Sequence, residues 1–310
     1  MTRYTEYSPL TTDRIFLSYV GMETDLIFNR GIDLPGFAAF PLVKTADGRD
    51  ILKEYFEQQI ELASQNDVGV MLESPTWMAN RDRGATIGYK PEDIISANQE
   101  SLSLMAKIKA EKGYSPVILS AQVGPRDDAY EPAEQMSVSE AKSYHLEQIN
   151  TFAATKADLI SAFTLCYAEE AAGIALAAQT CKMPVAISFT VETDECLPTG
   201  MTVDEAIEQV DQISDNYPDY YLINCAHPNH FSSLLDISKQ IKRIKGVVVN
   251  ASSCSHAELN EAEILDDGNP DELGQQLGDL KNRFPHFTIF GGCCGTDFRH
   301  MAKIVIEVAR

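Results

Sequence analysis

The feature that most constrains the fold of this chain is a regular alternation of short apolar runs with longer amphipathic stretches. The short runs are rich in β-branched and aromatic residues, which is typical of buried strands. The longer stretches show the periodicity of helices that cover a sheet. The predicted strands are residues 15–20, 68–72, 116–122, 158–163, 185–190, 220–224, 246–250 and 287–290. The predicted helices are residues 48–65, 91–112, 139–155, 168–181, 202–214, 231–242, 271–284 and 297–308.

Eight strands that alternate with eight helices predict a parallel sheet, because parallel neighbours need a crossover of about a dozen residues. A count of eight favours closure of the sheet. We therefore expect a single α/β domain over residues 1–310, folded as a (β/α)₈ TIM barrel. An open, doubly wound sheet is the structural alternative. Its nucleotide-binding form is disfavoured because no GxGxxG or GxxxxGKS/T loop follows any predicted strand.

The charge of the chain narrows the class of partner. Acidic residues number 46 and basic residues 25, for a net charge of −21. A nucleic-acid partner is disfavoured because phosphate binding needs a basic surface. No uncharged apolar run approaches the roughly 18 residues of a membrane-spanning helix, and the N-terminus lacks the pattern of a secretory signal. We expect a cytoplasmic protein that acts on small molecules away from membranes; its oligomeric state is not predicted.

The carboxyl ends of the strands of such a barrel carry the active site. After the eighth predicted strand the sequence reads Gly-Gly-Cys-Cys-Gly-Thr-Asp over residues 291–297. Glycines on both sides of Cys293 and Cys294 allow the backbone to leave β geometry, so that both sulfurs can point inward. Thr296 or Asp297 is a candidate N-cap, which predicts a helix N-terminus beside the thiols. Cys225 ends the sixth predicted strand and is expected at the same rim.

Three thiols from two strand ends predict a zinc site formed by Cys225, Cys293 and Cys294. Soft sulfur ligands favour Zn²⁺, and three protein ligands leave a fourth position open, as in catalytic sites. A zinc ion with three thiolates suits the activation of an incoming thiol. The adjacent pair is also compatible with simple packing or with a vicinal disulfide. Cys254 follows the seventh predicted strand and could approach the site.

Three sequence elements resemble the homocysteine S-methyltransferase family. They are Gly-Gly-Cys-Cys-Gly-Thr at 291–296, Asn224-Cys225, and Gly124-Pro125-x-x-Asp128-x-Tyr130. The resemblance covers essentially the whole chain and implies a (β/α)₈ barrel in which Cys225, Cys293 and Cys294 hold zinc. It also implies the reaction: homocysteine would bind the metal through its sulfur and attack the methyl group of a sulfonium or quaternary ammonium donor, giving methionine.

The chain departs from the family pattern around the metal motif. Residues 19–26 read Tyr-Val-Gly-Met-Glu-Thr-Asp-Leu, where the family has a loop of the type Asp-Gly-Gly-Met-Gly-Thr-Glu-Leu. Phe163 stands where a family glutamate helps to hold the amino acid end of homocysteine, and residues 250–258 replace a Pro-Asn-(Ser/Ala)-Gly-Glu segment. An ammonium group left without its carboxylate costs several kcal/mol when buried. Either Glu73 or Glu192 supplies the charge, or the acceptor is another thiol.

These departures leave two function classes open. The first is a zinc-dependent S-methyltransferase, for homocysteine or for a different small thiol. The second is a zinc- or thiol-binding barrel without transferase activity. For the enzyme, the predicted substrate-binding residues are the aromatic Tyr19, Trp77 and Phe163, which attract cationic methyl donors, together with Glu73 and Asn224. The acidic segment 251–270 is expected to be a surface excursion.

Overall fold

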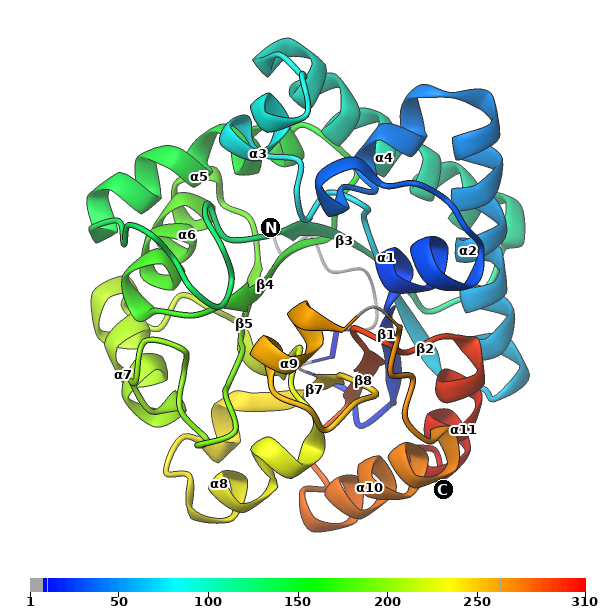
Figure 1. The fold of residues 1–310 in the computed structure, drawn as a ribbon, viewed down its shortest axis with the longest axis vertical. Helices are drawn as coiled ribbons and strands as arrows, with labels where there is room; N and C mark the ends of the chain where they lie inside the picture. The colour runs from blue at the N-terminus through cyan, green and yellow to red at the C-terminus, as the bar shows by residue number, and fades with distance from the viewer. Residues whose placement is uncertain (1–7, 10, 263) are drawn as a thin grey trace.

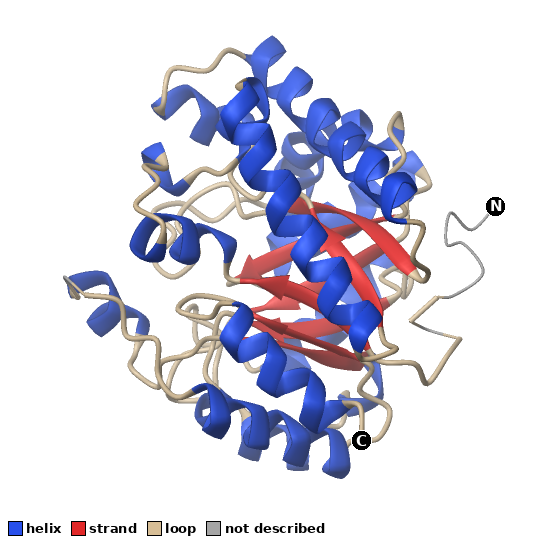
Figure 2. Cartoon of the chain, turned by 90° about the vertical axis from the view of Figure 1, so that its right-hand side faces the viewer, coloured by secondary structure: helices blue, strands red, loops and turns tan. Residues whose placement is uncertain are grey.

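The computed structural model describes residues 8–9, 11–262 and 264–310, and it contains a closed barrel of eight parallel strands in sequential order. The predicted fold is therefore confirmed. The strands are β1 Phe16–Val20, β2 Gly69–Glu73, β3 Val117–Val123, β4 Leu159–Leu165, β5 Val185–Phe189, β6 Tyr220–Asn224, β7 Ile244–Val249 and β8 Ile289–Gly292. The last strand pairs with the first, with Phe16 opposite Ile289, so the described sheet has no free edge. Figure 1 looks into this ring of strands, and Figure 2 shows the helices packed around it.

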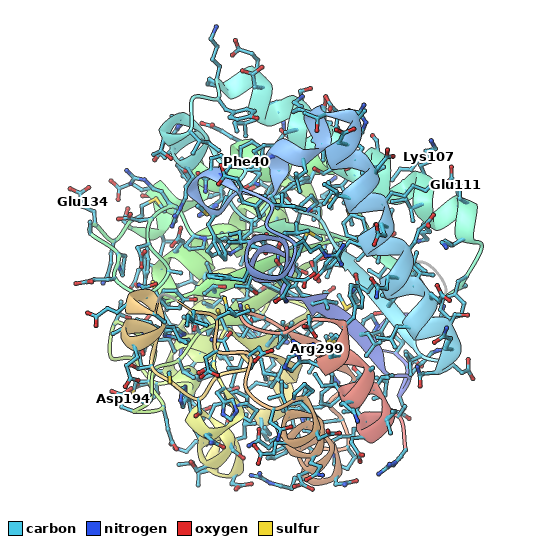
Figure 3. All side chains as sticks on the ribbon, turned by 45° about the vertical axis from the view of Figure 1, so that its right-hand side comes forward. Phe40, Lys107, Glu111, Glu134, Asp194 and Arg299 are labelled. Atoms are coloured by element: carbon cyan, nitrogen blue, oxygen red, sulfur yellow. The ribbon has the colours of Figure 1, made fainter. Side chains whose placement is uncertain are left out.

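The helices form the outer layer of the barrel. They are α2 Ala46–Gln65, α4 Pro91–Lys112, α5 Val138–Ala153, α6 Ala168–Cys181, α7 Val203–Ser214, α8 Ser232–Ile237, α10 Pro270–Arg283 and α11 Phe298–Val308. Local sequence sets several starts: Pro91 is the first residue of α4, and Thr202 forms a capping box with Glu205 at α7. No described helix is long and apolar enough to cross a bilayer. Figure 3 shows charged side chains such as Lys107 and Glu111 on the outer surface.

The predicted helix over residues 231–242 is wrong in its second half. α8 stops at Ile237, Ser238 is extended, and a separate 3₁₀ turn covers Ile241–Arg243. The carboxylate of Asp204 on α7 accepts hydrogen bonds from the backbone N–H groups of Lys239 (2.7 Å) and Gln240 (3.4 Å). These groups are thereby paired outside a helix, so a contact from another element decides where α8 ends.

The described residues of the acidic segment 251–270 are mostly exposed, as expected for a surface excursion, but Ala251, Ser252 and His256 are buried. The segment forms the short helix α9 His256–Glu261, which lies over the strand ring near β7 and β8. Three further short elements occupy the same end of the barrel: α1 Met22–Thr24, a π-helical turn Asp25–Asn29 and α3 Arg81–Thr86. In Figure 2 the strand arrowheads point toward the side on which these loops gather. The carboxyl ends of the strands are thus covered by segments that the periodicity did not predict. The N-terminal stretch that was expected to lack a secretory signal includes residues 1–7 and 10, which lie outside the described residues. Residue 263 of the acidic segment lies outside them as well.

Candidate metal centre and substrate pocket

Three cysteine sulfurs lie together at the carboxyl end of the barrel. Cys225 directly follows β6, and Cys293 and Cys294 directly follow β8. The three sulfur atoms lie within 4.8 Å of one another, and the Sγ atoms of Cys225 and Cys294 are 3.5 Å apart. All seven cysteines are free thiols in the structure. The structure therefore brings together the three residues that the sequence predicted as metal ligands.

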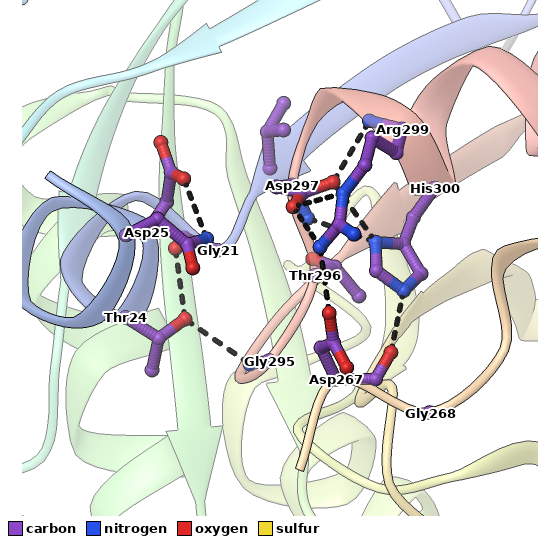
Figure 4. A network of polar contacts seen from close by, with 12 residues as sticks. Gly21, Thr24, Asp25, Asp267, Gly268, Gly295, Thr296, Asp297, Arg299 and His300 are labelled. Atoms are coloured by element: carbon purple, nitrogen blue, oxygen red, sulfur yellow. Dashed lines mark hydrogen bonds and ion pairs between the residues drawn. The ribbon is translucent and has the colours of Figure 1, made fainter. Parts of the chain in front are cut away.

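The backbone around the cysteine pair is fixed by contacts from two other segments. Gly295 takes a left-handed conformation with φ 79°, which a residue with a Cβ adopts at a cost. Its N–H donates to Thr24 Oγ1 at 3.1 Å, and the Cys294 N–H donates to Asn250 Oδ1 at 3.1 Å. Asp297 is the N-cap of α11, as expected. Figure 4 shows this turn held between α1 and the start of α11.

The spacing and chemistry of the sulfurs fit a soft metal ion. Tetrahedral zinc with bonds of about 2.3 Å places two thiolate ligands about 3.8 Å apart, close to the distances found here. A metal bound by these three ligands would keep one position for a further ligand. The donor set excludes hard ions such as Mg²⁺ and Ca²⁺, which select oxygen.

Electrostatics favour a thiolate at Cys225. Hydrogen bonds from the Cys293 and Cys294 thiols hold the pKa of Cys225 well below its usual range. The Tyr130 hydroxyl lies 2.8 Å from Cys225 Sγ. Burial and then the nearby cysteine charges raise the pKa of Tyr130 well above its usual value, so this hydroxyl remains a donor. Cys225 thus receives hydrogen bonds of the kind that stabilise a metal-ligating thiolate.

A histidine from α9 supports the same cysteine from its backbone side. His256 Nε2 lies 2.6 Å from the Cys225 carbonyl oxygen, and Nδ1 lies 2.7 Å from Glu192. The imidazole also stacks on the Tyr130 ring, with centroids 3.9 Å apart. Burial opposes the charged imidazolium, but the bonds to Cys225 and Glu192 raise the pKa of His256 to about 10. This arrangement orients Cys225 and Tyr130 toward each other.

A cavity of about 470 Å³ opens beside the sulfur cluster. Tyr19, Trp77 and Phe163 line it, as do all three cysteines. The rings of Tyr19 and Phe163 meet edge to face at 6.4 Å, and Trp77 Nε1 donates to the Phe163 carbonyl at 3.1 Å. Gly124 permits this placement, since a Cβ there would lie 2.5 Å from the Trp77 carbonyl oxygen. Three predicted aromatic side chains therefore line the same cavity as the sulfurs.

The remaining predicted residues divide between those at the cavity and those away from it. Asn224 lines the cavity, but its Oδ1 already accepts from Thr164 N–H and Ser188 Oγ. Glu73 does not line it: the carboxylate lies inside the barrel, 3.2 Å from Ser18 Oγ, and burial raises its pKa to about 7. Glu192 is engaged by His256. Cys254 is outside the cluster and contacts Asp266.

Three residues at the site were missed as functional candidates: Glu23, Tyr130 and His256. Each of these three residues lines the cavity. Tyr130 belongs to the family-like loop, while Glu23 and His256 lie in the two segments where the chain departs from the family pattern. The departures from the family pattern were the signal that could have identified Glu23 and His256. Residues that take over from the family's substrate-binding residues are expected in the segments that differ from the family.

Comparison with known proteins places this geometry in a family. Residues 21–308 match the family model described as homocysteine S-methyltransferase. No curated protein sequence gives a significant match. The oxidized form of the homocysteine methyltransferase MmuM from Escherichia coli superposes with a TM-score of 0.76 at 17% identity, covering 98% of this chain and 100% of that chain. Its metallated form gives 0.74 at 18% identity, covering 97% and 100%. The solved structures share the fold, and the family match spans nearly the whole barrel: the chain belongs to the homocysteine S-methyltransferase family and is an S-methyltransferase.

Proposed function

We propose that this enzyme moves a methyl group from a sulfonium or quaternary ammonium donor to a thiol acceptor bound at zinc, with homocysteine as the acceptor and methionine as the product. The observation that carries the proposal is the convergence of Cys225, Cys293 and Cys294, whose sulfurs lie within 4.8 Å of one another beside a cavity of about 470 Å³. When bound, zinc would hold the acceptor sulfur as a thiolate at neutral pH.

The residues around the sulfurs suit this transfer. The sulfur–carbon bond to the acceptor forms as the bond between the methyl group and the donor breaks, the donor leaves neutral, and the thiol proton passes to solvent. Tyr19, Trp77 and Phe163 offer aromatic faces to a cationic donor, each worth about 0.5–2 kcal/mol. Alignment of the two reactants in such a site can supply several powers of ten in rate.

Tyr130 and His256 complete the proposed metal centre. The Tyr130 hydroxyl donates to Cys225 Sγ at 2.8 Å and limits the negative charge on that ligand. His256 fixes the Cys225 carbonyl at 2.6 Å. Residues in such positions hold ligands in the geometry that the metal requires. These two residues orient the metal ligand and have no assigned contact with substrate.

A methyltransferase for a different small thiol is the second candidate. It is motivated by Phe163, whose ring lines the cavity and meets Tyr19 edge to face at the position of a family glutamate. Two aromatic rings there would also suit an acceptor without a charged group. The two candidates share the metal centre and differ only in the acceptor.

The test is product formation by the zinc-loaded protein. Homocysteine is supplied with S-methylmethionine, S-adenosylmethionine or betaine, and methionine is measured. Turnover with any donor, one zinc per chain, and loss of both in Cys294→Ser would support the proposal. Absence of methionine with every donor, while another thiol is methylated, would support the second candidate. Absence of bound zinc in the reduced protein would refute both.

A further inference from the structure

Glu23 is a buried carboxylate that lines the cavity beside the sulfur cluster. It lies on α1, which is docked against the cysteine turn: the Gly21 N–H donates to the Gly292 carbonyl at 3.0 Å, and Thr24 Oγ1 accepts from Gly295 N–H at 3.1 Å. Burial, and then the charge of Cys225, raises the pKa of Glu23 to about 7. The carboxylate lines the same cavity as the three sulfurs and, at 6% exposed, is poorly solvated.

No described basic side chain forms an ion pair with Glu23. The neighbouring carboxylate Asp25 has a cation, Arg30, at 3.0 Å. The two basic side chains that line the cavity, Arg83 and His256, are engaged by the Asp127 carbonyl and by Glu192. A buried carboxylate without a cation is costly. A ligand that brings a positive charge into the cavity would remove this cost.

Gln122 indicates independently that the ligand carries a hydrogen-bond donor. It is 2% exposed, lines the same cavity, and its side-chain oxygen has no hydrogen-bond partner among the described residues. Among the buried amide side chains of the cavity, the oxygens of the other two are used: Asn224 accepts from Thr164, and Asn250 accepts from Cys294. The buried groups of the cavity thus include two uncommitted acceptors, the Glu23 carboxylate and the Gln122 amide oxygen.

The reaction decides which cation suits Glu23. The positive charge of a sulfonium or quaternary ammonium donor disappears as its methyl group leaves. A carboxylate against that charge would stabilise the reactants more than the transition state and slow the reaction. An ammonium group on the acceptor keeps its charge throughout, so its pairing lowers both states equally and contributes to binding. A cation that does not react is the better partner.

We propose that Glu23 binds the ammonium group of the acceptor, so that the acceptor of this enzyme is an aminothiol even though Phe163 and Tyr19 are aromatic. This inference rests on the proposed function, because it assumes that the acceptor sulfur binds at the cysteine cluster. It assigns specificity to a residue of α1, and it makes Gln122 the second acceptor for the ammonium N–H groups. A simple alkanethiol would leave both groups unpaired.

The experiment compares two thiols that differ only in the ammonium group: homocysteine and 4-mercaptobutanoate. Their binding to zinc-loaded protein is measured by calorimetry, and zinc-edge absorption reports whether a fourth sulfur joins the metal. The variants are Glu23→Gln, which keeps the shape and removes the charge, and Glu23→Asp, which keeps the charge. Glu131→Gln is the matched control, because it removes a solvent-exposed carboxylate next to Tyr130. Zinc content verifies that each variant is intact.

The wild-type protein is expected to prefer homocysteine by about 10- to 100-fold, the range for one charge-assisted hydrogen bond. Glu23→Gln should lose this preference by weakening homocysteine alone, Glu23→Asp should recover part of it, and Glu131→Gln should keep it. An unchanged preference in Glu23→Gln, or none in the wild type, would overturn the inference while leaving the proposed function intact. If neither thiol adds a sulfur to the metal, the proposed function falls together with it.

Discussion

Tyr130→Phe removes a single hydroxyl from the proposed metal centre and keeps the ring. In the structure that hydroxyl lies 2.8 Å from Cys225 Sγ, while the ring stacks on His256 at 3.9 Å. A hydrogen bond to a charged group contributes about 1.5–3 kcal/mol, and one pKa unit corresponds to about 1.4 kcal/mol. We therefore expect the pKa of Cys225 to rise by about one to two units in the variant.

A higher pKa means stronger competition between protons and the metal for Cys225. At pH 7 the zinc affinity of Tyr130→Phe should fall by about 10- to 100-fold, as is usual for a partner of a metal ligand. Competition with a chelator of known affinity measures this ratio. Because the ring and its stacking remain, the expected loss belongs to the hydroxyl alone.

Tyr144→Phe is the matched control for this experiment. It also removes a phenol hydroxyl from a hydrogen bond, since Tyr144 donates to Asn80 Oδ1 at 2.9 Å, but no cysteine takes part. Its zinc affinity should stay within about threefold of wild type, less than 0.7 kcal/mol. If Tyr130→Phe also stays within that range, the hydroxyl does not stabilise the thiolate, and the assignment of Tyr130 is wrong.

Three other perturbations test the site and its support. Gly124→Ala places a Cβ 2.5 Å from the Trp77 carbonyl oxygen. The fluorescence emission of Trp77, the chain's single tryptophan, should therefore shift, and the KM for the methyl donor should rise. Unchanged emission would contradict the assigned contact. Contacts with His300 and Arg299 outweigh burial and hold the pKa of Asp297 well below its usual range, so Asp297→Asn should lose about 1–2 kcal/mol of stability at pH 7. This loss should shrink as the pH falls below about 4, because the unfolded chain then takes up a proton at Asp297 while the folded protein, whose pKa there is lower, still holds the carboxylate charged; a pH-independent difference in urea midpoints would refute it. Removal of zinc by a chelator should abolish thiol binding but leave the far-UV circular dichroism unchanged, because backbone pairing between the eight described strands closes the sheet and the three cysteines lie only at the ends of β6 and β8; unfolding on chelation would show that the metal is structural.

The sequence by itself determined the barrel and the three cysteines that meet at its rim. Apolar runs and amphipathic stretches repeat locally, so their number and order predict eight strand–helix units without knowledge of any long-range contact. The cysteine motif could be identified for the same reason. Glycines beside Cys293 and Cys294, and the position of Cys225 at a strand end, are local features, and parallel strands bring their carboxyl ends to one rim.

Tertiary structure decided the residues that surround the cysteines. Tyr130 contacts a sulfur 95 positions away, and His256 bonds to a carbonyl 31 positions away. Glu73 and Glu23 are both glutamates near strand ends, yet Glu73 lies inside the barrel against Ser18, whereas Glu23 lines the cavity and no basic side chain of the described residues pairs with it. Burial and the presence of a partner depend on which segments pack together, and a linear pattern does not contain that information. The covering segments are irregular, so only packing could place them.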